Sequence, residues 1–249
     1  MNRGLIRWAA VLAVAGVTTG AAAAAPHWLR GLESFRVQRV EVTGTRYLSP
    51  AEVLRASGIT SEATVFDDPA PWRERLLELP LVADAQIERK VPEGLVIRVT
   101  EAEPVAWAAV PALEPVDARG VLLPIRVGGA APDVPVVPTV ASTANHRIKN
   151  VHVLRVLGTL DAIRRYEPEL AGAISEATPA PDRAVRLLLR SALGVELLVA
   201  AAPTASTLEQ LEQTLKHLAG RGELARVQRI DARFADQVVV TFNPNPVVN

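Results

Sequence analysis

The stretch Leu79 to Trp107, LPLVADAQIERKVPEGLVIRVTEAEPVAW, predicts two β-strands joined by a tight turn. The turn is Val91-Pro92-Glu93-Gly94, in which Pro presets one φ angle and Gly is free to adopt a positive one. The strand before the turn carries Val82, Ala85 and Ile87. After the turn, Leu95, Ile97 and Val99 alternate with Val96, Arg98 and Thr100, which is the period of a half-buried sheet.

The segments before this hairpin predict one strand and two short helices. Residues 35–42 form the expected strand. Ser49-Pro50-Ala51-Glu52 is a helix start, because Ser can cap, Pro fits the first helical position and Glu suits the positive end of the helix dipole. That helix ends at Gly58, and a second begins at Asp68-Pro69. The order strand, helix, helix, strand, strand therefore defines a first domain over residues 35–103.

The remaining sequence predicts a second α+β domain, over residues 104–242, built on an antiparallel sheet, with a tail at 243–249. A hairpin is expected around Asp117-Ala118-Arg119-Gly120, and a surface loop over residues 128–138. Helices are expected over residues 148–166 and from Thr207 to about Gly220. The expected strands, apart from the hairpin's two at 113–117 and 121–125, are 104–109, 174–178, 184–190, 195–199, 226–231 and 237–242.

The N-terminus indicates a membrane segment. Trp8 to Ala25 is an uncharged run of apolar and small residues, near the lower length limit for crossing a bilayer. Arg3 and Arg7 precede it, which places residues 1–7 in the cytoplasm by the positive-inside rule. Residues 26–34 would be a spacer, and the bulk of the chain would lie outside the inner membrane. The alternative is a cleaved signal peptide, because Ala21 to Ala25 offers small-residue cleavage sites.

Composition excludes several classes of function. Lys plus Arg and Asp plus Glu both number 27, so the chain lacks the cationic surplus that nucleic-acid binding requires. The chain has no Cys, which excludes disulfides, thiolate nucleophiles and Cys-based zinc sites. At 49% hydrophobic residues it can bury a sizeable core.

The sequence predicts no cofactor, no metal site and no enzyme activity. The four His, at 27, 146, 152 and 217, are not spaced as metal ligands, and neither a P-loop nor a nucleophile elbow occurs. Glu101 and Glu103, two apart on one expected strand, could in principle act as a glycosidase pair. Solvent exposure at a strand end is the simpler interpretation, since aromatic residues that could hold a sugar make up only 4% of the chain.

The expected C-terminal strand is a stronger functional signal than the possible catalytic residues. Val238, Val239 and Val240, with Phe242, are apolar and mostly β-branched. At a sheet edge such a strand presents unpaired N–H and C=O groups, which can receive a partner strand. The pattern alone leaves open whether the strand lies at an edge or is an ordinary central strand.

Three phrases together resemble the bacterial cell-division proteins called FtsQ or DivIB. The predicted element order, ending in Glu101-Ala-Glu-Pro-Val-Ala106, is similar to a POTRA domain. Val116-Asp117-Ala-Arg-Gly120-Val-Leu122 looks like the turn that follows this domain in the family. The third phrase, Ile230-Asp-Ala-Arg-Phe-Ala-Asp-Gln-Val-Val-Val240, looks like the family's C-terminal strand pair. The resemblance covers residues 5 to 242.

The resemblance implies a single-pass inner-membrane scaffold at the division site. The second domain would bind the small single-span partners FtsB and FtsL, and the complex would help recruit and activate septal peptidoglycan synthesis by FtsW and FtsI. Partner binding would occur by strand addition at Gln237, Val238, Val239 and Val240. Phe234 matches the aromatic position before that strand and is the expected side-chain anchor, with a place in the core as its alternative.

Two other functions stay open at this point. One is a POTRA-bearing component of outer-membrane protein assembly or secretion, although the sequence has no second POTRA copy and no room for a long run of barrel strands. The other is a secreted envelope enzyme acting through Glu101 and Glu103.

Overall fold

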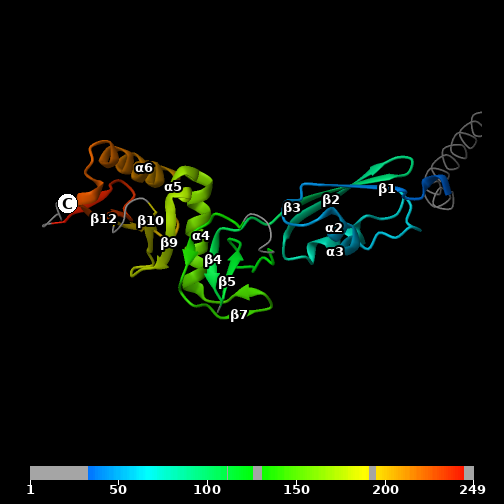
Figure 1. Ribbon diagram of the computed structural model, residues 1–249, viewed down its shortest axis with the longest axis horizontal. Helices are drawn as coiled ribbons and strands as arrows, with labels where there is room; N and C mark the ends of the chain where they lie inside the picture. The colour runs from blue at the N-terminus through cyan, green and yellow to red at the C-terminus, as the bar shows by residue number, and fades with distance from the viewer. Residues whose placement is uncertain (1–32, 111, 126–130, 191–194, 244–249) are drawn as a thin grey trace, which may run out of the picture. The chain divides into compact units, whose positions relative to one another are not determined.

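The computed structural model describes residues 33–110, 112–125, 131–190 and 195–243. The chain divides after Glu101 into two compact units, unit 1 up to Glu101 and unit 2 from Ala102 onward. Figure 1 shows both. Three predicted features lie wholly or partly outside the described residues: the Trp8 to Ala25 segment with its flanks, the beginning of the loop over residues 128–138, and the tail after Asn243. Within the described residues, no helix combines the length and apolar character needed to cross a membrane.

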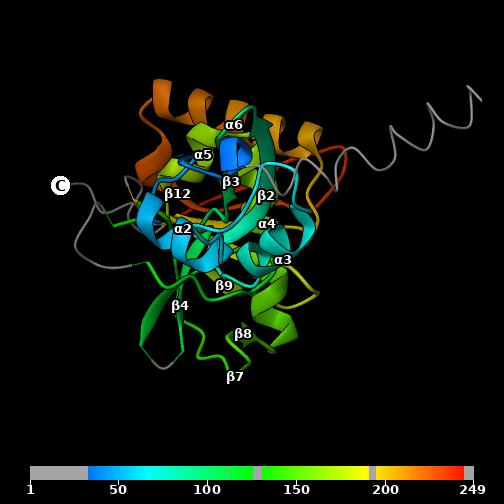
Figure 2. The same cartoon turned by 90° about the vertical axis from the view of Figure 1, so that its right-hand side faces the viewer.

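Unit 1 is a three-stranded sheet with two helices packed on it. The strand order is β1-β3-β2, with β1 parallel to β3 and β2 antiparallel to it. Figures 1 and 2 show the two helices side by side. The elements are the 3-10 helix η1 (Glu33–Phe35), β1 (Arg39–Thr43), α2 (Pro50–Ser57), α3 (Ala70–Leu77), β2 (Val82–Lys90) and β3 (Gly94–Glu101).

Local sequence signals account for these elements. The side chain of Ser49 accepts from the N–H of Glu52, and the Glu52 carboxylate accepts from the N–H of Ser49, which is a capping box. Gly58 ends α2 in the left-handed region at φ 69°. The core lies between sheet and helices and contains Val53, Leu76, Val82, Ala85, Ile97 and Val99. Trp72 is buried beside it with Ala63 and Leu95.

Two details of unit 1 differ from the prediction. The first strand begins at Arg39 rather than Phe35, because Val37 donates to the carbonyl of Ala63 and residues 35–37 therefore run beside that loop. In the hairpin, the Val91-Pro92 peptide bond is cis, and Gly94 does not have a positive φ. Glycine is favoured at position 94 because the backbone of Lys90 comes close to it: a Cβ on residue 94 would lie 2.9 Å from the carbonyl oxygen of Lys90.

Unit 2 is built on an eight-stranded sheet in the order β13-β12-β11-β10-β9-β6-β4-β5. The prediction of an antiparallel sheet is wrong, because crossover connections return some strands in the same direction as their neighbours. The sheet is mixed: β11 pairs parallel with β12, and β6 lies parallel to both β4 and β9, while the other pairs are antiparallel. Its strands are β4 (Ala106–Ala109), β5 (Leu113–Val116), β6 (Val136–Val137), β9 (Ile174–Pro179), β10 (Val185–Leu189), β11 (Glu196–Val199), β12 (Val227–Ala232) and β13 (Val239–Phe242).

Helices pack against this sheet over one large core. The helices are α4 (Val151–Tyr166), α5 (Pro168–Ala173) and α6 (Ala205–Gly220), with a 3-10 turn η2 (Leu224–Arg226) before β12. Helix α4 lies against β9 and β10, and α6 lies against β12. The core includes Val156, Leu157 and Ile163 from α4 and Leu187, Leu197 and Ile230 from the strands.

Several helix and strand boundaries in unit 2 also differ from those predicted. Residues 121–125 do not form a full strand, since Val121 and Leu122 make only isolated bridges and Pro124 has no N–H to donate. The first long helix begins at Val151, capped by Asn150, because Arg147–Ile148 (β8) instead pairs with Thr143–Ala144 (β7). The second begins at Ala205, capped by Thr204. The last strand starts at Val239, two residues later than predicted.

Candidate partner-binding edge

The two edges of the unit 2 sheet are β13 and β5. Strand β13 pairs antiparallel with β12, placing Val240 opposite Ile230 and Val239 opposite Asp231. Because a strand at the end of the order has a neighbour on one side only, half of its backbone hydrogen-bonding groups face outward. The structure therefore places the expected strand at an edge, a point that the sequence pattern left open.

The opposite edge, at β5, is covered. Leu123 donates to the carbonyl of Pro115 at 2.9 Å, and Asp117 donates to the carbonyl of Val121 at 3.0 Å. Residues 121–123 thus run along the outer side of β5 and use its backbone groups. Within the described part of unit 2, β13 is the edge that no other segment covers.

The predicted binding residues separate into exposed and core-facing groups. Val239 is 42% exposed and Phe242 43% exposed, and Gln237 is also exposed, just before the strand. Val238 and Val240 are half-buried and pack against the large core. The core therefore fixes the strand through Val238 and Val240, while Val239 points away from it, as the two-residue alternation of a strand requires.

Phe234 lies in the turn between β12 and β13 and is 42% exposed, so it is not a core residue. The guanidinium of Arg233 lies 6.0 Å from the centre of its ring. A shallow cavity of about 280 Å³ adjoins the ring, lined by Asp182, Arg183, Ala184, Ala200, Ala201, Arg233 and Phe234. An aromatic side chain beside a small hollow is a suitable anchor for an apolar side chain from a partner.

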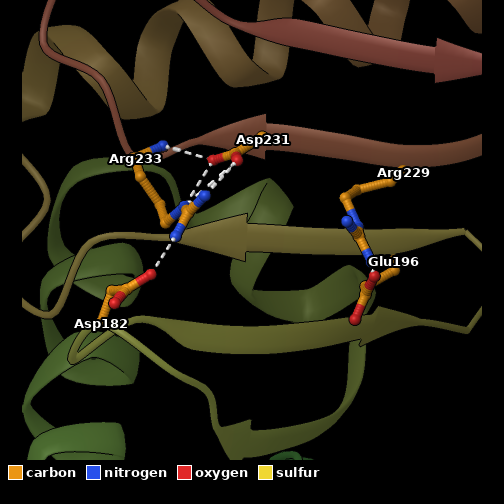
Figure 3. A network of polar contacts seen from close by, with 5 residues as sticks. All are labelled: Asp182, Glu196, Arg229, Asp231 and Arg233. Atoms are coloured by element: carbon orange, nitrogen blue, oxygen red, sulfur yellow. Dashed lines mark hydrogen bonds and ion pairs between the residues drawn. The ribbon is translucent and has the colours of Figure 1, made fainter.

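An ionic network holds this turn, as Figure 3 shows. The Asp231 carboxylate accepts from the N–H of Arg233 at 3.1 Å and from its Nη2 at 2.7 Å. The other guanidinium nitrogen, Nη1, lies 3.3 Å from Asp182. The hydrogen bonds from Arg233 hold the pKa of Asp231 below its usual value, although partial burial acts in the opposite direction. The turn that carries Phe234 is therefore tied to β12 and to the β9–β10 turn.

A second ionic group crosses three strands beside the edge. Glu196 on β11 accepts hydrogen bonds from Arg186 on β10 and from Arg229 on β12, the latter at 2.6 Å. Figure 3 shows the Arg229 and Glu196 side chains meeting. Burial alone would raise the pKa of Glu196, but the hydrogen bonds from the two arginines outweigh it and the pKa is lowered.

Sequence reasoning missed Asp182 and Arg183, which belong to this site in space. Both have positive φ angles, 56° and 60°, and they are the two central residues of the turn from Pro181 to Ala184 between β9 and β10. Ala184 donates to the carbonyl of Pro181 across that turn, at 3.0 Å. The Pro181-Asp182 pair is a turn signal, but only the folded sheet brings Asp182 to Arg233 from 51 residues away.

The prediction that Glu101 and Glu103 share one face of a strand is wrong. Strand β3 ends at Glu101, which lies opposite Val82 at the start of β2, so Glu103 falls beyond the end of the strand. The Glu101 carboxylate accepts from the backbone N–H groups of Tyr47 and Leu48, both at 2.8 Å, whereas Glu103 pairs with Arg164. Each carboxylate has its own structural partner, and the two do not form an acid–base pair.

In the ranges that the structure describes, no three His, Asp or Glu side chains are arranged so that they could hold a metal ion.

Comparison with known proteins identifies both units. Residues 35–102 match the family model described as "POTRA domain, FtsQ-type", and residues 105–233 match "Cell division protein FtsQ/DivIB, C-terminal". Named relatives extend over most of the chain. "Cell division protein FtsQ" of Rhodothermus marinus is 31% identical over 253 residues, which cover 97% of this chain and 87% of the relative.

Two further relatives with the same name support the assignment. The protein of Myxococcus fulvus is 25% identical over 232 residues, covering 89% of this chain and 81% of the relative. That of Streptomyces venezuelae is 40% identical over 80 residues, covering 31% of this chain and 29% of the relative. On the family models and on the match over nearly its whole length, the chain belongs to the FtsQ/DivIB family of cell division proteins.

Proposed function

We propose that the protein is a bitopic scaffold of the inner membrane that binds FtsB- and FtsL-type partners through β13 and helps recruit septal peptidoglycan synthesis by FtsW- and FtsI-type proteins. The observation that carries the proposal is the uncovered edge at β13, in a sheet whose other edge is covered. Membership of a cell-division family supports the class of partner.

The proposed mechanism is strand addition. A partner segment would pair with the outward backbone groups of β13, with Gln237 and Val239 offering exposed side chains beside it. Phe234 and its adjoining cavity would receive one apolar partner side chain. The ionic network of Arg233 with Asp231 and Asp182 would hold the turn in place before binding, which lowers the ordering cost of association.

The membrane assignment rests on the sequence. Residues 8–25 would anchor the chain, residues 1–7 would be cytoplasmic, and residues 26–34 would connect the anchor to the two domains outside the membrane. An anchor shared with single-span partners restricts both to one surface and so raises their effective concentration.

The first experiment is photo-cross-linking in living cells from a photoreactive residue at position 239. Leu113, which is 53% exposed on the opposite edge strand, provides a matched control position. We expect capture of a small single-span division protein from position 239 and far less from position 113.

Three outcomes would contradict the proposal in different ways. Equal capture from both positions would remove the special role of β13. No adduct from position 239 would mean that this edge is not a docking site, while the family assignment would stand. Capture of outer-membrane precursors would favour the assembly function instead.

A further inference from the structure

The sheet of unit 1 has two edges, and side chains already occupy one of them. At β2, Arg73 from α3 donates through Nε to the carbonyl of Ala85 at 2.8 Å and pairs with Asp84 at 2.7 Å. Farther along the strand, Arg89 donates through Nε to the carbonyl of Val65 at 2.7 Å. The preceding helix and loop are thus bound to β2, which hinders the approach of another strand on that side.

The edge at β1 has no comparable cover among the described residues. Arg39 lies opposite Gly94 and donates its N–H to the carbonyl of Glu93 at 3.2 Å. Because alternate residues of a parallel strand face their neighbour, the backbone groups of Arg39, Glu41 and Thr43 face β3. Those of Val40 and Val42 face outward, and no hydrogen bond from a described residue meets them.

The side chains of β1 alternate between the two faces of the sheet. Val40 and Val42 pack against the unit 1 core on the helix side. Arg39 and Glu41 lie on the other face, where Arg39 is 3.3 Å from Glu93 and Glu41 is 3.5 Å from Lys90. The side chains of Arg39 and Glu41 are both more than half exposed, so their ion pairs are weak and can be exchanged for others.

We propose that β1 pairs with β1 of a second copy of this chain, antiparallel, about a two-fold axis that passes beside Val40. In this register Val40 faces its own copy and exchanges both backbone hydrogen bonds with it. Arg39 then lies opposite Glu41 of the second copy, and Glu41 opposite its Arg39. The sequence Arg-Val-Glu at 39–41 is therefore complementary to itself when read in the opposite direction.

The charges also select this register. Moving the axis by one residue, to Glu41, would place two carboxylates directly opposite each other, which is unfavourable. The same alternation of charge favours a second copy over an unrelated strand, since the Arg39 and Glu41 positions of both copies are satisfied at once. This proposal concerns a different edge in a different unit and does not depend on partner binding at β13.

The absence of Cys makes a clean test available. In the full-length chain, Val40→Cys should give a covalent dimer on mild oxidation or with a short bis-maleimide reagent, because paired residues across antiparallel strands lie within disulfide range. Glu41→Cys should give much less, since residue 41 faces residue 39. Gln86→Cys, on the occupied edge β2, is the control and should stay monomeric.

Charge reversal provides the second variant set, with Val40→Cys as the reporter. Arg39→Glu or Glu41→Arg alone should slow dimer formation by about tenfold, because each change places like charges opposite each other at both symmetric positions. The double variant R39E/E41R should restore the rate. Circular dichroism before oxidation shows whether each variant remains folded.

The results of these experiments distinguish the proposed register from other registers and from the absence of pairing. Cross-linking from Val40→Cys that is restored by the double variant supports the proposal. Stronger cross-linking from Glu41→Cys would overturn the register. No dimer from any folded variant, or equal yields from Gln86→Cys, would overturn pairing through β1.

Discussion

At the residue scale, the phrase Asp-Ala-Arg occurs twice and builds the same local structure each time. Asp117 accepts from the N–H of Arg119 at 2.9 Å and also bonds its Nε. Asp231 accepts from the N–H of Arg233 at 3.1 Å and likewise bonds its Nε, at 2.9 Å. Such Asx turns fix the chain where a strand ends. Two of the three phrases that carry the family resemblance are therefore turn-building segments, one in each half of unit 2.

The second of these turns leads to a pH prediction. The pKa of Asp231 is lowered in the folded protein by its hydrogen bonds to Arg233. A carboxyl with a lowered folded pKa stabilises the fold above its unfolded pKa, about 3.9, and this contribution is lost as pH falls through the folded pKa. Asp231→Asn should therefore unfold at lower urea concentration than the unmodified chain at pH 7, and the difference should shrink toward pH 3.

Asp236→Asn, in the same turn region but exposed, is the control for this titration. Its urea midpoint should follow that of the unmodified chain across the whole range. A difference for Asp231→Asn that stayed constant from pH 7 to pH 3 would show that the charge of Asp231 does not contribute.

Phe234 gives the sharpest binding prediction at this scale. If it is the anchor at β13, Phe234→Ala should weaken partner affinity by about 30-fold, the size expected for a hot-spot aromatic residue. Tyr166, 50% exposed at the end of α4, is a matched control, and Tyr166→Ala should leave the affinity unchanged. Titration calorimetry with a peptide of the partner captured from position 239 measures both. Equal affinities for the two variants would exclude Phe234 as an anchor.

At the element scale, periodicity and capping predicted the long elements and missed the short ones. The order of β1, α2, α3, β2 and β3 follows from alternation, Ser49, Gly58 and the apolar stripe of α3. Strands β6, β7 and β8 have only two residues each, too few to show a period. Helix α5 (Pro168–Ala173) follows α4 after the single residue Glu167, and its six residues are too few to show a helical period of their own.

The candidate site could be predicted as a strand but not as an edge. Whether β13 is central or outermost depends on the order of strands in space, which is set by the crossover through α6 that places β12 parallel to β11. Alternation in Val238, Val239 and Val240 is the same in either position. The ion pair of Asp182 with Arg233 was missed for a related reason, since only tertiary structure brings these residues together.

The cap of α6 gives a prediction at this scale. The hydroxyl of Thr204 accepts from the N–H of Thr207 at 3.2 Å, and no residue of the helix itself can replace it there. Thr204→Ala should lower the free energy of unfolding by about 1 kcal/mol. Thr214→Ala, in the middle of the same helix, should be neutral or stabilising because Ala has the higher helix propensity. Urea unfolding of both variants measures the difference; an equal loss in both would show that the cap does not matter.

At the scale of the whole molecule, the described residues form separate cores on either side of Glu101. The core clusters of unit 1 run from Val53 to Val99, and the large cluster of unit 2 begins at Val105. Each of these clusters of described residues draws its buried members from one unit. Damage to one core should therefore leave the other core intact.

Leu76, fully buried in unit 1, tests this separation. Leu76→Ala should destabilise unit 1 by about 2–5 kcal/mol through loss of buried surface and creation of a cavity. Hydrogen exchange should then show faster exchange of the β2 and β3 amides, with β10 and β11 unchanged. Faster exchange throughout both units would mean that they fold as one cooperative body. Leu187→Ala should give the reverse pattern, because Leu187 is fully buried in unit 2.

The place of β13 in the sheet also has a consequence for biosynthesis. Every other strand of the unit 2 sheet precedes it in the chain, and β12 has β11 on one side and β13 on the other. A chain whose synthesis stops before Val239 would therefore have a sheet that ends at β12. Such a truncated chain would present β12 to its surroundings in place of β13, so the proposed docking surface exists only in chains that contain Val239–Phe242.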